Sequence, residues 1–246
     1  MILTYIIIFS FAGSIGAIAG ASILMLLGSK VKMIIPYILS YAIGTLLGAA
    51  FLGMLPKAMT MLSPALALKC ALIGLLFFFL LEKIVIWRHC HDPQCDVHSA
   101  TGYLILIGDA FHNFMDGVVI ATAFMVSVPL GIGTSLAVIA HEVPQEVGDF
   151  AILLDSGMNK WKAFFYNLLS ALPTLPGALI AYFSLMQLRQ FIPFILVLSA
   201  SSFIYIAMAD LIPATHKNVT WKTVLAELIL ILAGIGTIGL FHRQSL

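Results

Sequence analysis

Charged residues are scarce in this chain. Asp, Glu, Lys and Arg make up 9% of its 246 residues, whereas hydrophobic residues make up 61%. A typical soluble domain has about 25% charged and roughly 45–50% apolar residues. So few polar side chains cannot cover the apolar mass with a water-facing surface, and lipid must therefore surround most of the chain. The composition excludes a soluble protein and indicates an integral membrane protein.

Net charge and cysteine are also low. The 12 basic and 11 acidic residues nearly cancel, so the chain has no basic surface for nucleic acid. The 3 cysteines are an odd and sparse set, which argues against a disulfide-stapled secreted module. We therefore expect no nucleic-acid partner, and we expect the function to lie within the membrane-embedded part.

Eight apolar stretches are long enough to form membrane-spanning helices, which need about 20 residues each. They cover residues 3–28, 34–55, 64–87, 101–126, 129–156, 161–186, 190–212 and 222–242. The first stretch lacks the positive n-region of a signal peptide and is too long for its apolar region, so we count it as a helix. The breaks are short, and the longest is near residues 88–100. The sequence therefore predicts a single all-α transmembrane domain over residues 1–246.

Basic residues are distributed unequally between the two sets of breaks. Eight follow the odd-numbered spans: Lys30, Lys32, Lys83, Arg88, Lys160, Lys162, Lys217 and Lys222. Four lie on the opposite side: Lys57, Lys69, Arg189 and Arg243. Basic residues accumulate on the cytoplasmic side of a membrane, so we expect both termini to lie outside. The compact loops and the lack of a targeting signal favour a bacterial inner membrane, with an organelle membrane as the alternative.

Polar and ionisable side chains are concentrated in the fourth and fifth predicted spans. The fourth contains Asp109, His112, Asn113 and Asp116, and the fifth contains His141, Glu142, Gln145, Glu146 and Asp149. An ionisable group at the centre of a membrane helix costs roughly 2.5–3.5 kcal/mol, so this concentration requires a reason. Spacings of three and four place each set on one helical face. Because lipid cannot solvate them, we expect the two faces to meet in the bundle or to line a wet path.

Imidazoles and carboxylates that face one another form a divalent-cation site. Nitrogen and oxygen ligands suit Zn²⁺, Fe²⁺, Mn²⁺ or similar ions better than Cu⁺. Pro144 has no amide hydrogen, so it would weaken the fifth span and free a carbonyl oxygen beside the polar face. Asp109 and Asp149 could instead be structural or orient the ligands, and Glu146 could carry a proton or a second ion. For the two histidines, the alternative is an interhelical hydrogen bond.

At these positions the sequence resembles the ZIP family of zinc and iron transporters. The resemblance rests on His112-Asn-Phe-Met-Asp-Gly117 and on His141-Glu-Val-Pro-Gln-Glu-Val-Gly-Asp149. Stretches that begin at Asn167 and Phe203 are also similar, so the likeness covers nearly the whole chain.

The resemblance implies a transporter that moves a divalent metal into the cytoplasm, with zinc, iron, manganese or cadmium as substrate and no catalytic cofactor. It implies a transport site formed by His112, Asn113, Asp116, His141, Glu142 and Gln145. It also implies a 3+2+3 arrangement of eight helices with inverted pseudo-symmetry, and a homodimer. Two positions depart from the family pattern: Gln145 stands where His is common, and Lys57 follows the second span in place of an acidic ending.

The break after the third span is rich in potential metal ligands. His89, Cys90, His91, Cys95 and His98 lie within ten positions. These side chains can bind Zn²⁺, but their spacing matches no closed zinc finger. We expect a loop that collects or senses metal on the cytoplasmic side, and a merely solvated polar loop is the alternative.

Two other functions fit parts of the pattern. His141-Glu142-Val143-Pro144-Gln145 resembles the His-Glu-x-x-His helix of an intramembrane zinc metalloprotease, in which Glu142 would be the general base. Gln145 and Pro144 both work against that interpretation, because the protease needs a second imidazole one turn later. A membrane metal sensor would need an output domain, which the sequence does not offer. We therefore predict a transporter and not an enzyme.

Overall fold

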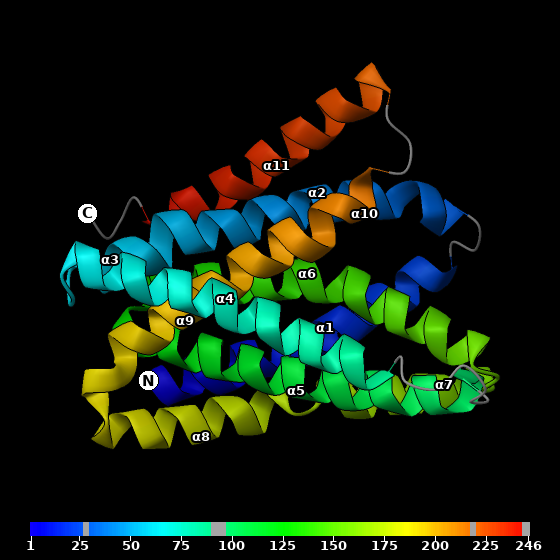
Figure 1. The fold of residues 1–246 in the computed structure, drawn as a ribbon, viewed down its shortest axis with the longest axis horizontal. Helices are drawn as coiled ribbons and strands as arrows, with labels where there is room; N and C mark the ends of the chain where they lie inside the picture. The colour runs from blue at the N-terminus through cyan, green and yellow to red at the C-terminus, as the bar shows by residue number, and fades with distance from the viewer. Residues whose placement is uncertain (27–29, 90–96, 217–219, 243–246) are drawn as a thin grey trace.

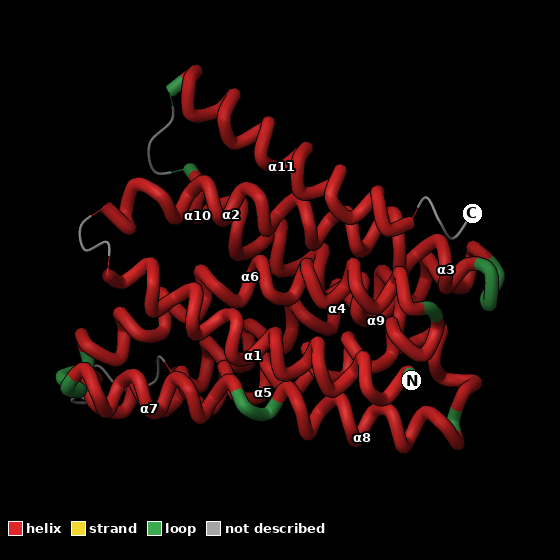
Figure 2. Tube along the Cα trace, turned by 180° about the vertical axis from the view of Figure 1, so that it is seen from behind, coloured by secondary structure: helices red, strands yellow, loops and turns green. Residues whose placement is uncertain are grey.

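The computed structural model describes the backbone of residues 1–26, 30–89, 97–216 and 220–242, and this part of the chain is helical and contains no strand. The elements are α1 (Ile2–Leu26), α2 (Val31–Gly48), η2 (Ala49–Met54), α3 (Leu55–Met59), α4 (Pro64–His89), α5 (Val97–Val126), α6 (Val128–Asp155), α7 (Lys160–Ala171), α8 (Thr174–Gln187), η3 (Arg189–Phe191), α9 (Ile192–Tyr205), η4 (Ile206–Leu211), α10 (Ile212–Thr215) and α11 (Trp221–His242). Figure 2 shows that the described loops between them are short. The prediction of an all-α protein is confirmed.

Seven stretches of the described chain are long and apolar enough to cross a membrane. They are Ile2–Ile23, Met33–Met59, Pro64–Lys83, Ile105–Val126, Lys160–Gln187, Arg189–Thr215 and Trp221–Phe241. The helix α6 has 28 residues and is also longer than the roughly 20 needed, but it carries the acidic residues of the fifth predicted span. The long helices run back and forth along one axis, and α1 begins at the same end of the molecule at which α11 ends (Figure 1). An integral membrane protein accounts for this architecture.

Two of the membrane-crossing segments contain a wider π-helical turn that ends two residues before a proline. The turn η2 precedes Pro56, and η4 precedes Pro213. Proline has no amide hydrogen, and its ring clashes with the carbonyl four residues earlier. Those carbonyls belong to Leu52 and Ala209, which both lie inside the π-helical turns. The wider turn therefore accommodates the proline without ending the segment.

The two helices with polar faces lie inside the bundle. They are joined at Ser127, whose side chain accepts a hydrogen bond from the Leu130 amide at 3.3 Å and caps α6. The helix α5 approaches α8 closely, because a Cβ atom at Gly117 or Gly177 would meet backbone atoms of the opposite helix. On its other sides α6 packs against α1 and α2. The polar faces are thus enclosed by protein.

The apolar residues divide between a packed interior and an exposed outer surface. Phe124 of α5 is fully buried, and its ring centroid lies 6.0 Å from that of Tyr5 and 5.3 Å from that of Phe9. Large side chains such as Ile73 of α4 and Ile229 of α11 are exposed instead. An apolar surface of this kind is expected where lipid is the solvent.

Candidate metal centre

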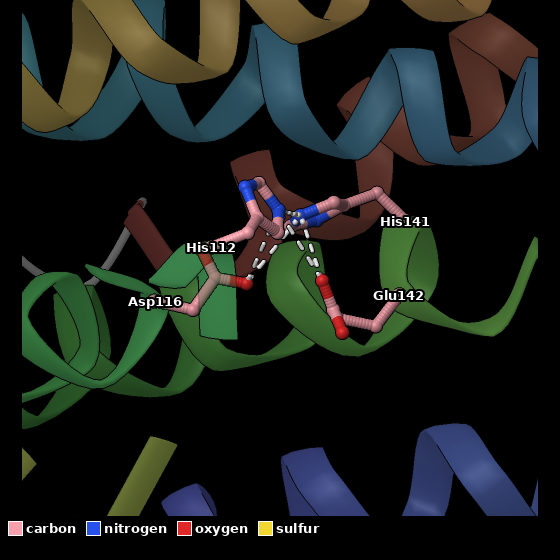
Figure 3. A group of neighbouring side chains, drawn as sticks. All are labelled: His112, Asp116, His141 and Glu142. Carbon is pink, nitrogen blue, oxygen red and sulfur yellow. Dashed lines mark hydrogen bonds and ion pairs between the residues drawn. The ribbon is translucent and has the colours of Figure 1, made fainter. Parts of the chain in front are cut away.

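The polar faces of α5 and α6 meet at a group of four side chains. Figure 3 shows His112 and Asp116 of α5 and His141 and Glu142 of α6 pointing toward one another. Each offers one ligand atom, and all four atoms lie within 4.8 Å of one another. We call these four residues the mixed-ligand group, because they supply two nitrogen and two oxygen atoms.

The spacing of these atoms fits a single small cation. The two histidine Nε2 atoms are 3.2 Å apart, and the distances from His112 Nε2 to Glu142 Oε1 and from His141 Nε2 to Asp116 Oδ2 are 3.3 and 3.4 Å. His141 Nε2 lies 3.5 Å from Glu142 Oε1, and His112 Nε2 lies 3.9 Å from Asp116 Oδ2. Bonds of about 2.0–2.2 Å from a tetrahedral zinc ion would place its ligand atoms about 3.3–3.6 Å apart. The group therefore needs little rearrangement to hold such an ion.

The backbone of α6 orients one of the two imidazoles. Nδ1 of His141 lies 3.0 Å from the carbonyl oxygen of Ala137, one turn earlier. When Nδ1 donates its hydrogen to that oxygen, Nε2 is left with a free lone pair directed into the group, as in many metal-binding histidines. The helix α6 is continuous through Pro144, so the expected weakening at this residue does not end the helix.

Because the mixed-ligand group is buried, its negative charges are energetically unfavourable unless a cation is bound. Asp116, His141 and Glu142 are each at most 3% exposed, and the His112 side chain is 25% exposed. Among the described residues, Asp116 Oδ2 and both carboxylate oxygens of Glu142 have no hydrogen-bond partner. Imidazole nitrogens lie close to Asp116 Oδ2 and Glu142 Oε1, and they are charged only when protonated. Buried carboxylates without hydrogen bonds are unfavourable, and a bound divalent cation would compensate them.

A cavity of about 310 Å³ reaches the mixed-ligand group from between α4, α5 and α9. His112 and Asp116 line it, together with apolar side chains and the polar groups of Glu82, Tyr205 and Asp210. The Tyr205 hydroxyl donates a hydrogen bond to the carboxylate of Glu82. The cavity explains why His112 is more exposed than the other three members of the group.

A second group lies beside the first and shares Glu142 with it. One carboxylate oxygen from each of Asp109, Glu142 and Glu146 lies within 4.8 Å of the others, and all three residues are buried. We call these residues the carboxylate group. The amides of Asn113 and Gln145 each donate a hydrogen bond of 3.0 Å to Asp109 Oδ1. Both amides therefore contact this group through Asp109.

Two helices that the sequence reasoning did not include support these groups. Asn167 of α7 donates to the backbone oxygen of Glu146 at 3.2 Å, and the Thr174 hydroxyl of α8 donates to Asn113 Oδ1 at 3.1 Å. Both residues are buried. Their signal in the sequence is a polar side chain within an apolar span, which is the same signal that identified the fourth and fifth spans.

The remaining predicted residues belong to neither group or lie outside the described part of the chain. Asp149 lies on α6 beyond Glu146, is partly buried, and belongs to neither group. Lys57 lies in α3 and is partly buried. Cys90, His91 and Cys95 lie outside the described residues, as do the side chains of His89 and His98, so the metal-binding loop stays a prediction.

The sequence matches known proteins over most of its length. The family model for the ZIP zinc transporter matches residues 87–242, which is more than half of the chain. The chain belongs to the ZIP family. The resemblance stated from His112 to Gly117 and from His141 to Asp149 is thus confirmed.

Similar proteins are described as zinc transporters. The chain is 33% identical to zinc transporter ZIP13 of Pongo abelii over 221 residues, which are 83% of this chain and 66% of that protein. It is 37% identical to zinc transporter foi of Drosophila melanogaster over 149 residues, 59% of this chain and 20% of that protein. It is 39% identical to zinc transporter zipt-7.2 of Caenorhabditis elegans over 141 residues, 56% of this chain and 30% of that protein. The chain thus spans less than two thirds of these relatives.

Membership of a transporter family does not favour the metalloprotease. The local geometry agrees, because the position of the second protease histidine is occupied by Gln145, whose amide donates to Asp109. No imidazole follows His141 one turn later on α6. The two histidines that do meet come from different helices.

Proposed function

We propose that this protein carries zinc across a membrane into the cytoplasm and that the mixed-ligand group is its transport site. The observation that carries the proposal is the convergence of two imidazole nitrogens and two carboxylate oxygens between two helices of a lipid-embedded bundle. Membership of the ZIP family and similarity to proteins described as zinc transporters support it.

The ligand set favours zinc and is compatible with related ions. Imidazole and carboxylate ligands suit Zn²⁺, and they also accommodate Fe²⁺, Mn²⁺ and Cd²⁺. A transport site must bind its ion strongly enough to capture it and weakly enough to release it. The exposure of His112 to the cavity, while His141 is buried, gives the ion one side from which it can enter or leave.

We further propose the 3+2+3 arrangement, in which the first three and the last three segments are inverted repeats around α5 and α6. The π-helical turns support it. They occupy the second and seventh segments, which correspond in such a repeat, and each precedes a proline by the same interval. Inverted repeats are common in secondary transporters and place the binding site near the middle of the membrane.

The proposed orientation rests on the basic residues. The end of α4, the start of α7 and the start of α11 lie at the same end of the molecule (Figure 1). In the sequence, eight of the 12 basic residues lie at or near the breaks after the odd-numbered predicted spans. We therefore place this end in the cytoplasm and both termini outside. A homodimer, a bacterial inner membrane, a single domain over residues 1–246 and a metal-collecting loop at residues 89–98 stay predictions.

Zinc uptake into proteoliposomes tests the proposal. Purified protein should carry Zn²⁺ into vesicles that contain a fluorescent zinc indicator. The variants His112→Ala and His141→Ala should reduce uptake to the level of protein-free vesicles, because each removes one of the two imidazoles. His216→Ala is the matched control, since His216 is exposed at the end of α10, and it should retain uptake.

The same experiment separates the transporter from a metal sensor. A sensor would bind Zn²⁺ without moving it, so the intact protein would leave the indicator unchanged. Normal uptake by both His112→Ala and His141→Ala would refute the proposed site. Parallel uptake of Fe²⁺, Mn²⁺ and Cd²⁺ would rank the ions that the site accepts.

A further inference from the structure

All three tryptophans of the chain lie at one end of the molecule, and each directly precedes a basic residue. The pairs are Trp87-Arg88, Trp161-Lys162 and Trp221-Lys222. They fall in the last turn of α4 and in the first turns of α7 and α11, which lie at the same end of the bundle (Figure 1). Membrane proteins commonly place tryptophan at both faces of the bilayer. Its restriction to one end points to a partner that is present on that side of the membrane.

The tryptophans of α7 and α11 are left uncovered by the protein. Trp161 is 83% exposed and Trp221 is 82% exposed. Each stands at the start of a membrane-crossing segment, which is Lys160–Gln187 for Trp161 and Trp221–Phe241 for Trp221. At the boundary of such a segment an indole ring lies among lipid headgroups, where both its apolar body and its N–H group find partners. The surface of the bilayer therefore accounts for the exposure of these rings.

Exposed lysines accompany both rings. Lys160 and Lys162 flank Trp161, and Lys222 follows Trp221. Neither helix has an acidic residue in its first turn that could neutralise these lysines. Lys162 is already engaged, because its ammonium nitrogen lies 5.7 Å from the centroid of the Tyr166 ring. Lys160 and Lys222 therefore carry the positive charge that each helix offers to a ligand at the interface.

The opposite end of the molecule does not combine the two kinds of side chain. Lys69 of α4 and Arg189 of η3 are exposed there, but no tryptophan of the chain lies near that end. An ammonium group beside an indole ring can bind a headgroup phosphate while the ring stays at headgroup depth. In a zwitterionic lipid the headgroup's own cation offsets the phosphate charge. The combination therefore fits an anionic phospholipid better than a zwitterionic one.

We infer that Lys160 with Trp161, and Lys222 with Trp221, bind anionic phospholipid headgroups at the end of the molecule that we place in the cytoplasm. The two pairs stand on different parts of the bundle, since α7 contacts α5 and α6 whereas α11 packs mainly along α2. The bound lipids fix the depth of both parts in the membrane. On α7 they also hold the helix whose Asn167 donates to the backbone oxygen of Glu146.

Quenching of tryptophan fluorescence by brominated lipids tests the inference. The full chain is reconstituted in phosphatidylcholine vesicles with a minor fraction of phosphatidylglycerol. Bromine is carried either by the phosphatidylglycerol or by an equal fraction of the phosphatidylcholine. Trp87→Phe/Trp221→Phe leaves Trp161 as the only emitter, and Trp87→Phe/Trp161→Phe leaves Trp221.

We expect phosphatidylglycerol to be enriched about fivefold beside each ring, the factor that corresponds to the roughly 1 kcal/mol per lysine at an anionic surface. Equal quenching by the two brominated lipids would overturn the inference. Enrichment beside one ring alone would overturn it for the other pair.

Charge substitutions in these single-emitter chains identify the lysines. Lys160→Gln should abolish the enrichment beside Trp161, and Lys222→Gln should abolish it beside Trp221. Lys160→Arg and Lys222→Arg should retain it, because a guanidinium group also binds phosphate. Lys69→Gln is the matched control, since Lys69 is exposed at the opposite end, and it should leave both values unchanged. Full enrichment in Lys160→Gln and Lys222→Gln would contradict the inference.

Salt and inorganic phosphate distinguish a lipid headgroup from a free anion. Added NaCl should lower the enrichment, because exposed charges are screened. Inorganic phosphate at the same ionic strength should lower it no further, and a larger loss would show that the pairs bind a free anion instead. Size-exclusion chromatography of each variant confirms that it is folded. The preparations contain no zinc, so the result does not depend on whether the protein transports it.

Discussion

The helices α6 and α11 are both long enough to cross a membrane, but they differ in where they lie. The helix α6 packs against α1, α2 and α5, and it contains buried polar side chains such as His141, Glu142 and Glu146. The helix α11 packs mainly along α2 and diverges from the bundle toward Trp221 (Figures 1 and 2). Most of its large apolar side chains are exposed. A helix can carry ion ligands only where protein, and not lipid, surrounds it.

The contact between α11 and α2 shows how a lipid-exposed helix is held. Gly44 and Gly234 let the two backbones approach, because a Cβ atom at either position would meet backbone atoms of the other helix. The hydroxyl of Tyr41 donates to Thr237 Oγ1 at 3.1 Å across the same contact. Association in lipid depends on such close packing, since burial of apolar surface gives little advantage there. In α6, by contrast, the polar groups lie at the contact with α5.

A charge placed on α11 should have the largest effect on stability. Leu228 is 49% exposed on the outer surface of α11. Leu228→Asp would place a carboxylate in lipid and should cost about 2.5–3.5 kcal/mol in membrane insertion. The fraction of chains inserted, measured in microsomes by protection from protease, should fall accordingly. Leu228→Met is the control and should insert normally. Normal insertion of Leu228→Asp would show that protein covers this surface of α11.

A smaller effect on stability is expected from adding a side chain at the close contact between α5 and α8. In Gly117→Ala the new Cβ would meet the backbone of Thr174 and Ala178, which cannot move aside as a side chain could. We expect a loss of about 1–3 kcal/mol in stability, because the contact with α8 is overpacked. Gly13→Ala is the matched control, since nothing lies within 4 Å of a Cβ at that position.

The midpoint of thermal unfolding in detergent measures both glycine variants. Gly117→Ala should unfold at a lower temperature than the unmodified protein, and Gly13→Ala should unfold at the same or a slightly higher temperature, because alanine favours a helix over glycine. Equal midpoints for the two variants would show that α5 and α8 do not depend on close backbone approach.

The helical architecture followed from the sequence because lipid imposes a simple rule. Every backbone polar group in a membrane must be paired within its own segment, so an apolar stretch of sufficient length becomes a helix. Periodicity then predicted which residues share a face, and the structure brings His112 and Asp116 of α5 against His141 and Glu142 of α6. These inferences need only local spacing and the cost of burying charge.

Other features depended on contacts that no local pattern specifies. The sequence did not indicate that Glu142 would belong to two groups, or that Asn113 and Gln145 would both donate to Asp109. These relations depend on the rotation of α5 against α6, which α8 and the glycine contact at Gly117 help to set. We predicted a weakened helix only at Pro144, and local spacing did not indicate the π-helical turns found before Pro56 and Pro213.

The smallest effect is expected at the helix caps, where α6 and α11 are alike. Ser127 accepts a hydrogen bond from the Leu130 amide at the start of α6, and Thr220 accepts one of 3.2 Å from the Thr223 amide at the start of α11. Replacing either cap with Ala should cost about 1 kcal/mol, measured as a lower midpoint of thermal unfolding. Only Ser127→Ala should also weaken Cd²⁺ binding, because it loosens the turn that joins α5 to α6. Equal Cd²⁺ affinity in Ser127→Ala and Thr220→Ala would show that the two ligand groups are positioned by packing along α5 and α6 alone.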